Sequence, residues 1–254
     1  MYCFEVSKLD AKSLAEYKKS QGSRKSDSVV PGASPSNLVP LLVYFENMTR
    51  FVLPLCSAVQ TKMEENVPVT SCLYLVDISA LSMKQAWSLR EYIQDVSSIL
   101  ANNYPEVIDK VYVSISGHLC RQYMIFLTSN HQIIGAPFYF SKIWAFVKGW
   151  VEPNTAAKLV FLSEKEVLPT LYDRIDLENV PKMFGGSQDF TPGMLPDLDP
   201  EIKKSLNWKT LSQELPAGPV KWTLNGEGKV ESVAVGTIKD GNQRMESLAG
   251  LELS

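Results

Sequence analysis

Apolar runs and amphipathic segments alternate along the first three quarters of the chain. Leu73–Ile78 is an apolar, β-rich run bounded by loop residues, as expected for a buried parallel strand. Ser82–Asn103 follows with apolar residues at helical spacing, and Pro105 ends this predicted helix because the residue before a proline disfavours helical dihedrals. The same patterns predict further strands at residues 2–6, 111–113 and 158–162, and further helices at 11–19, 41–51, 140–151 and 168–175.

Strands and helices in this alternating order predict an α/β fold. We expect a mainly parallel sheet with helices on its faces and right-handed crossovers between its strands. Residues 20–40 are rich in Ser, Pro and Gly and are predicted to form a mobile loop. After Gly186 the pattern weakens, apart from a hairpin signal at 225–228. We therefore expect one domain over residues 1–190 and a C-terminal extension with a β-hairpin over 191–254.

Composition excludes several classes of protein. Of the 254 residues, 45% are hydrophobic and 21% charged, and the net charge of −3 gives no basic footprint for nucleic acid. No apolar run reaches the roughly 20 residues that span a bilayer, and the N-terminus lacks a secretory signal pattern. The cysteines are widely spaced, as free thiols in a reducing compartment are, at positions 3, 56, 72 and 120. We expect a cytoplasmic protein and a monomer.

Catalytic motifs are missing from the sequence. There is no G-x-G-x-x-G and no G-K-[ST], so no phosphate-binding loop is predicted. The two histidines, His118 and His131, lie with Cys120 in a segment that has no recognisable zinc-ligand spacing. We therefore expect no enzymatic activity, no cofactor and no metal site.

Four segments, in their order and spacing, resemble the CRAL-TRIO lipid-binding family, which includes phosphatidylinositol and phosphatidylcholine transfer proteins. They are Leu73–Ile78, Asn103–Glu106, Gly135–Phe140 and Glu178–Gly186. The resemblance covers about residues 1–190 and implies an α/β domain that holds one lipid between the sheet and a movable gate helix. The small helical domain that usually precedes this domain is not found in the sequence.

The resemblance also implies a set of lipid-binding residues. The gate helix corresponds to residues 140–151, although its pattern alone equally fits a plain core helix. Its two tryptophans and flanking lysines also suit a membrane interface, so we expect transient contact with a membrane surface. Core packing is the alternative role for the lining residues outside the gate. The implied lining residues are Tyr44, Phe51, Phe138, Phe140, Ile143, Trp144, Val147, Trp150 and Val151.

Three further residues are candidates for contact with a lipid headgroup. These are Glu166, Lys182 and Met183, and a solvated surface charge is the alternative role of the first two. Family members that select phosphatidylinositol commonly carry a lysine where Met183 stands. If this stretch is extended, neighbouring side chains point to opposite sides, so Lys182 faces solvent and Met183 faces the pocket. The sequence then predicts that a neutral or zwitterionic lipid binds at least as well as phosphatidylinositol.

Residues 113–132 interrupt the resemblance. Family members usually run directly from the strand after the Tyr-Pro-Glu turn into the Ala-Pro-Phe segment, and joining Tyr112 to Ile133 would restore a continuous apolar strand. Val113-Ser114 can be encoded by a common intron start, and Gln132 by a common intron end. Our hypothesis is a retained intron or gene-model error, and the alternative is a genuine surface loop. Sequenced transcripts that all retain these codons would contradict the intron hypothesis.

Two functions are consistent with these observations. The first is binding, with intermembrane transfer, of a phospholipid or similar hydrophobic ligand in an apolar pocket. The alternative is a structural or regulatory module that derives from a lipid-transfer domain and no longer binds lipid.

Overall fold

The chain folds into two compact units. The computed structural model describes residues 2–5, 38–58, 68–78, 83–114, 144–145, 148–190, 194–195, 197–237 and 241–251. The first unit comprises residues 1–33 and 72–192, and the second comprises 34–71 and 193–254. The second unit thus joins residues 34–71 to the C-terminal extension, and Phe51 and Leu55 are buried in the same core as residues of that extension.

The first unit is built on a sheet of four parallel strands in the order β1-β2-β3-β4. The strands are β1 (Tyr2–Glu5), β2 (Cys72–Asp77), β3 (Ile108–Ser114) and β4 (Leu159–Leu162). In the register of the sheet Leu75 lies beside Tyr112, and Tyr112 beside Val160. The predicted α/β fold with a mainly parallel sheet is confirmed.

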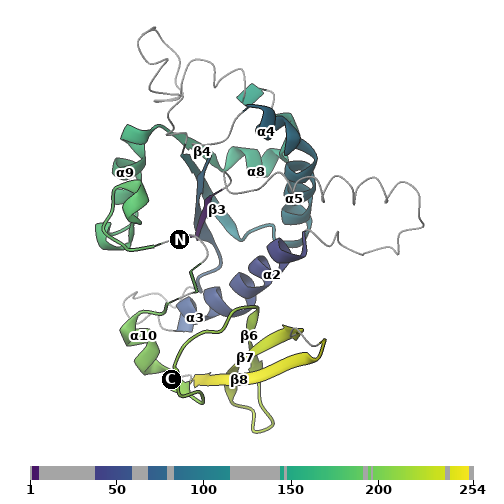
Figure 1. The fold of residues 1–254 in the computed structure, drawn as a ribbon, viewed down its shortest axis with the longest axis vertical. Coiled ribbons are helices and arrows are strands. Elements are labelled where there is room, and N and C mark those ends of the chain that lie inside the picture. The colour runs from purple at the N-terminus through teal and green to yellow at the C-terminus, as the bar shows by residue number, and fades with distance from the viewer. Residues whose placement is uncertain are drawn as a thin grey trace, which may run out of the picture. The chain divides into compact units, whose positions relative to one another are not determined.

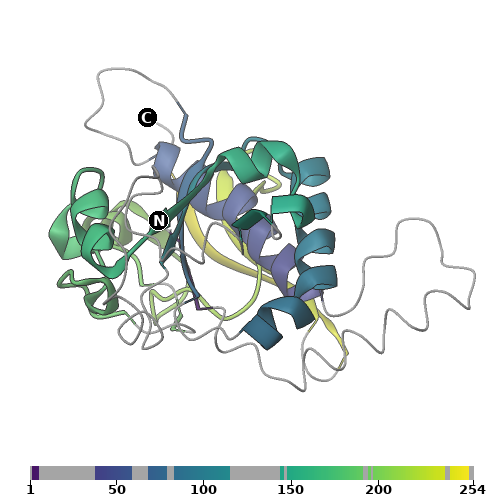
Figure 2. The same ribbon diagram turned by 90° about the horizontal axis from the view of Figure 1, so that it is seen from above.

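Helices lie on both faces of this sheet (Figures 1 and 2). On one side lie α4 (Met83–Ser88), α5 (Arg90–Asn103) and α8 (Pro153–Ala157), and on the other lies α9 (Glu164–Tyr172). The helix predicted over residues 82–103 is present but divided by a turn at Leu89. Short 3-10 helices are η3 (Lys148–Trp150), η4 (Leu177–Asn179) and η5 (Lys182–Phe184).

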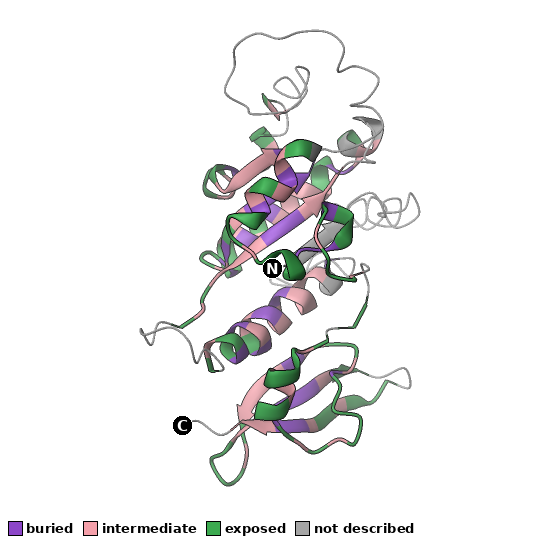
Figure 3. Ribbon diagram, turned by 90° about the vertical axis from the view of Figure 1, so that its left-hand side faces the viewer, coloured by how far each residue is buried: buried purple, intermediate pink, exposed green. Residues whose placement is uncertain are grey.

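Burial of β3 shows that this strand has cover on both faces (Figure 3). Its last four residues, 111–114, are consecutively buried, although adjacent side chains of a strand point to opposite faces. Tyr112 belongs to a core cluster with Leu75 and Leu162, into which α9 and the following turn place four more side chains: Val167, Leu171, Val180 and Phe184. By alternation, Val111 and Val113 point to the opposite face.

The end of β3 reaches into the segment 113–132. Val113 and Ser114 are sheet residues that pair with both neighbouring strands, so the first two residues of the interrupting segment 113–132 complete the strand. They do so because an apolar Val113 and a small Ser114 fit buried sheet positions. Residues 115–132 and Ile133 lie outside the described residues, as do the predicted helix 11–19 and the predicted loop before Leu38.

The second unit packs a helical segment on an antiparallel sheet. The helical segment is α2 (Val39–Asn47), the π-helix η2 (Met48–Val52) and α3 (Leu53–Ala58), and α10 (Pro200–Ser205) follows in the C-terminal part. The sheet has the order β5-β8-β7-β6, formed by β5 (Asn207–Trp208), β6 (Val220–Leu224), β7 (Val230–Thr237) and β8 (Gln243–Leu251). The predicted hairpin is confirmed, and the Asn225 side chain accepts the backbone N–H groups of Glu227 and Lys229 at its turn.

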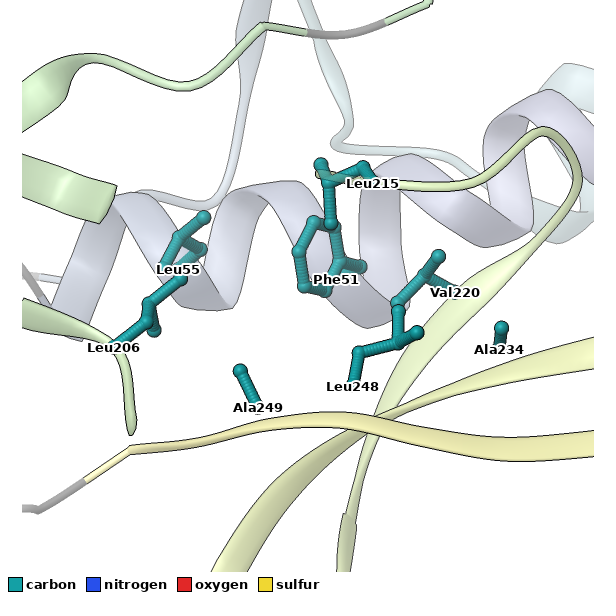
Figure 4. Packing of buried hydrophobic residues seen from close by; sticks show 8 residues of the cluster. All are labelled: Phe51, Leu55, Leu206, Leu215, Val220, Ala234, Leu248 and Ala249. Carbon is teal, nitrogen blue, oxygen red and sulfur yellow. The ribbon is translucent and has the colours of Figure 1, made fainter. Parts of the chain in front are cut away.

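The core of the second unit joins residues far apart in the sequence (Figure 4). Phe51 and Leu55 from the helical segment lie in one cluster with six residues of the C-terminal part: Leu206, Leu215, Val220, Ala234, Leu248 and Ala249. Two hydrogen bonds fix the helix to β6, because Trp222 Nε1 donates to the carbonyl of Phe51 at 3.0 Å and Asn47 Oδ1 accepts the Val220 N–H at 2.9 Å.

The turn after η4 leaves little freedom for side chains at its two glycines. Gly185 has φ of +90°, and a Cβ on Gly186 would lie 2.0 Å from the carbonyl oxygen of the fully buried Val180. Gly186→Ala is therefore expected to lower the free energy of unfolding by more than about 2 kcal/mol. Gly149→Ala is the matched control in the same unit, because nothing lies within 4 Å of its Cβ position. Urea denaturation measures both, and equal stabilities would contradict the steric argument.

Glu231 makes the stability of the second unit depend on pH. Its carboxylate pairs with Lys209 and accepts the Ser247 hydroxyl at 2.9 Å, and these two hydrogen bonds lower its pKa. The pKa of Glu231 in the folded protein lies below its value of about 4.3 in the unfolded chain. The ion pair therefore stabilises the folded second unit at neutral pH, and this contribution is lost as pH falls through the folded pKa. Glu231→Gln should lower stability at pH 7 and flatten the acid limb of the pH profile. Glu227→Gln, at an exposed ion pair with Lys229, should change neither.

Candidate functional site

An apolar face of the parallel sheet is the centre of the candidate site. Tyr74, Val111 and Val113 are buried and alternate with the residues that pack under α9. Phe161 of β4 lies on the same face, and the ring of Trp144 packs on the Phe161 ring with centroids 4.7 Å apart. Right-handed crossovers place the connections after β2 and after β3 on one face of such a sheet. The described start of the predicted gate segment therefore packs over apolar sheet residues.

The end of the predicted gate segment is fixed to α5 and α8. The Glu152 N–H donates to the hydroxyl of the buried Ser97 at 2.8 Å, and the Glu152 carboxylate accepts the Thr155 N–H at 3.0 Å as the N-cap of α8. Hydrogen bonds from the backbone of Asn154 and Thr155 lower the pKa of Glu152. Trp150 meets Trp87 of α4 edge-on, with ring centroids 5.8 Å apart. The chain is thus anchored by polar and aromatic contacts directly after η3.

The predicted gate helix 140–151 is only partly described. Residues 144 and 145 are helical, and Lys148–Trp150 forms a 3-10 turn. The backbone N–H of Val151 donates to the carbonyl of Lys148 at 3.4 Å. Trp144, Trp150 and Val151 are each partly buried. Four predicted lining residues lie outside the described residues: Phe138, Phe140, Ile143 and Val147.

Tyr44 and Phe51, predicted to line the lipid pocket, lie in the second unit. Phe51 is 1% exposed and stacks on Trp222, with ring centroids 5.3 Å apart. Tyr44 meets Phe45 edge-on at 5.6 Å. For Phe51 the structure favours the core-packing alternative, because its ring is enclosed between the helical segment and the antiparallel sheet (Figure 4).

Glu166 has a local structural role. The N–H and the hydroxyl of Ser163 both donate to its carboxylate, at 3.0 and 2.7 Å, which forms a capping box at the start of α9. Both hydrogen bonds end on Oε2 of the Glu166 carboxylate.

Lys182 and Met183 lie in a helical turn, so the alternation argument based on an extended chain is wrong. Residues 182–184 form the 3-10 helix η5, which brings the backbone N–H of Gly185 to the carbonyl of Lys182. The Lys182 side chain is 60% exposed and pairs with Asp189 at 3.1 Å, and Met183 is 44% exposed. Both side chains therefore reach solvent, while Phe184 enters the core.

A groove in the second unit has the wrong size for a diacyl lipid. Its volume is about 270 Å³, and its walls come from α2, η2 and the adjoining edge of the sheet, including Leu42, Val43, Pro219 and Val235. Pockets for drug-sized ligands start at about 300 Å³. None of the predicted lining residues contributes to it.

Within the described parts of the chain two kinds of feature are not found. These residues contain no cluster of three or more side chains that could ligate a metal ion. They also contain no helix with the length and apolar character required to cross a membrane.

The residues that sequence analysis missed are Trp87, Ser97 and Phe161. Phe161 could have been found from the alternation within its predicted strand. Trp87 and Ser97 carry no such signal, because each gains its role from a residue more than 50 positions away along the chain.

Comparison with known proteins finds a match to one protein family. The family model of the CRAL/TRIO domain matches residues 21–116 and 121–186, more than half of the chain. The break in this match falls within segment 113–132, although the second stretch resumes before the segment ends.

Individual relatives match a shorter part of the chain. The SEC14 cytosolic factor of Kluyveromyces lactis is 30% identical over 57% of this chain and 40% of its own length, and that of Candida glabrata is 28% identical over 57% and 39%. A phosphatidylinositol/phosphatidylcholine transfer protein of Arabidopsis thaliana is 27% identical over 56% of this chain and 21% of its own length. The chain thus spans about two fifths of the fungal relatives, and all of these matches leave much of each relative uncovered.

The capping box gives a direct test of the role of Glu166. Glu166→Ala should lower the free energy of unfolding by about 1 kcal/mol, because it removes the partner of Ser163 at the start of α9. The neighbouring exposed Lys165→Ala serves as the control and should change stability by less than about 0.5 kcal/mol. If Glu166→Ala instead changed which lipid is bound and left stability unaltered, Glu166 would be a headgroup ligand.

Proposed function

Because the chain belongs to the CRAL/TRIO domain family, we propose that it binds a phospholipid or similar hydrophobic ligand in an apolar pocket and transfers it between membranes. The name of the Arabidopsis relative, a phospholipid transfer protein, supports this function, and the names of the fungal relatives support a cytosolic location. We further propose that the chain acts as a monomer, without a cofactor or catalytic activity, and contacts membranes transiently.

The observation that carries this proposal is the apolar sheet face under Trp144. A diacyl lipid with about 30 methylenes resists leaving a bilayer by about 24 kcal/mol, at about 0.8 kcal/mol per methylene. Only a dry, apolar surface of similar area offsets this free energy. Val111, Val113 and Phe161 contribute apolar side chains to one face of the sheet, and the chain that follows Trp144 is anchored at Glu152.

A single observation favours the alternative, a non-binding structural module. Phe51 lies in the buried core of the second unit, which supports a packing role for this side chain. In the binding function proposed here, the sheet face and the residues around Trp144 supply the pocket.

Transfer of a fluorescent phospholipid between vesicles tests the proposal. Phe161→Glu places a charge on the apolar face and should lower the transfer rate at least tenfold, because alkyl chains would lie against a desolvated carboxylate. Tyr172→Glu is the matched control, since Tyr172 is 65% exposed at the end of α9. The proposal predicts transfer by the wild type and by the control. Equal rates in all three proteins, or none in the wild type, would contradict it.

Headgroup selection is proposed to be weak toward phosphatidylinositol. The cation nearest the glycine turn, Lys182, is exposed and paired with Asp189, and Met183 offers no charge to a phosphate. Lys182→Ala should therefore leave the phosphatidylinositol share of bound lipid nearly unchanged from that of the wild type. Mass spectrometry of the lipid in each purified variant measures the share, and a large loss in Lys182→Ala would identify Lys182 as the headgroup ligand.

A further inference from the structure

Trp87 is an exposed aromatic residue on α4 that the proposed pocket does not use. Its side chain is 57% exposed, yet its ring is held edge-on against Trp150 at 5.8 Å. Trp150 is itself partly buried and follows the exposed residues Lys148 and Gly149. The pair therefore presents one projecting indole on a fixed aromatic base.

The segment that carries Trp150 is hydrogen-bonded to α5. The backbone directly after Trp150 is tied to the middle of α5 by the Glu152 to Ser97 hydrogen bond of 2.8 Å, and α5 begins three residues after Trp87. Two segments separated by 63 positions thus present their tryptophans together. An indole that is already held in place loses little conformational entropy when it enters a second phase.

The charges around the pair indicate what this surface contacts. Lys84, Arg90 and Glu91 lie within four residues of Trp87, and Lys148 and Glu152 lie two residues before and after Trp150. Three cations and two carboxylates leave a net charge of only +1, which gives little attraction to a strongly anionic partner. The projecting apolar area is limited to the rings, which is small for a stable protein interface. Amphipathic rings bordered by charges of both signs match the headgroup region of a zwitterionic bilayer.

We propose that Trp87 and Trp150 form a membrane-docking surface that inserts the Trp87 indole into the interface of a zwitterionic phospholipid bilayer. This inference rests on the proposed function, because a protein that exchanges lipid must meet a membrane. It adds Trp87 of α4 to Trp150, which lies at the end of the segment predicted to be the gate. Docking through Trp87 would orient the first unit on the membrane, because Trp87 contacts Trp150 in a segment that is hydrogen-bonded to α5.

Vesicle sedimentation of the full chain with pure phosphatidylcholine vesicles tests the surface. Trp87→Ala should weaken vesicle binding about tenfold, since it removes the inserted ring. Trp87→Phe should lose less, because it keeps an aromatic ring. Tyr172→Ala is the matched control, an exposed aromatic at another place in the same unit, and should bind as the wild type does. Replacing a third of the lipid with phosphatidylserine should change the affinity by less than about tenfold, since the net charge of the surface is only +1.

Several results would overturn the inference. They are wild-type binding by Trp87→Ala, an equal loss in Tyr172→Ala, binding that requires phosphatidylserine, and no vesicle binding by the wild type. Quenching by brominated phosphatidylcholine gives an independent measurement, because the quenched fluorescence of the five tryptophans should fall in Trp87→Phe.

The proposed lipid pocket is tested separately, by measuring the lipid that co-purifies with Trp87→Ala. If Trp87→Ala has normal lipid content and unaltered vesicle binding, the docking surface is contradicted and the proposed function is supported. If the wild type carries no lipid but its vesicle binding still depends on Trp87, the docking surface is supported and the proposed function is contradicted.

Discussion

The parallel sheet of the first unit needs apolar cover on both faces. Its strands carry buried side chains at consecutive positions, as β3 does at 111–114, and such a strand is stable only when neither face meets water. On one face the cover is α9 and the glycine turn, which supply Leu171, Val180 and Phe184. On the other face the described cover includes Trp144 over Phe161. A bound lipid would be one more apolar element on a face that already requires one.

Sequence reasoning recovered the features that arise from local patterns. Strand β2, the helical region 83–103, the hairpin at 225–228 and the helical segment around Phe45 and Phe51 follow from periodicity and turn residues, which act over a few positions. The glycine turn was recognised by its motif, and the structure supplies the physical reason in the contact between Gly186 and the Val180 carbonyl.

The rest could not be predicted because it depends on partners distant in the sequence. No local pattern indicates that Phe51 stacks on Trp222 or that Asn47 accepts the N–H of Val220. For the same reason the sequence does not indicate that Phe51 is enclosed in the core of the second unit or that Glu166 caps α9. The assumption of an extended chain at Lys182 and Met183 failed because Pro181 opens a 3-10 turn instead of continuing a strand.

The C-terminal extension has a structural role that its weak sequence pattern does not reveal. Residues 193–254 lie beyond the part that matches the CRAL/TRIO domain, yet they supply six of the eight buried residues in the core around Phe51 and Leu55. A helical segment inside the family match therefore depends for its burial on a sheet outside it. Removing this sheet would expose Phe51, which explains why the second unit contains both stretches of chain.

The central claim is that the first unit holds a lipid. Native mass spectrometry of the full chain, purified without detergent and followed by organic extraction, tests it most directly. The account predicts one phospholipid-sized ligand per chain, released intact on extraction and reduced in Phe161→Glu. A folded chain with the mass of its polypeptide alone, unchanged after incubation with phosphatidylcholine vesicles, would contradict it.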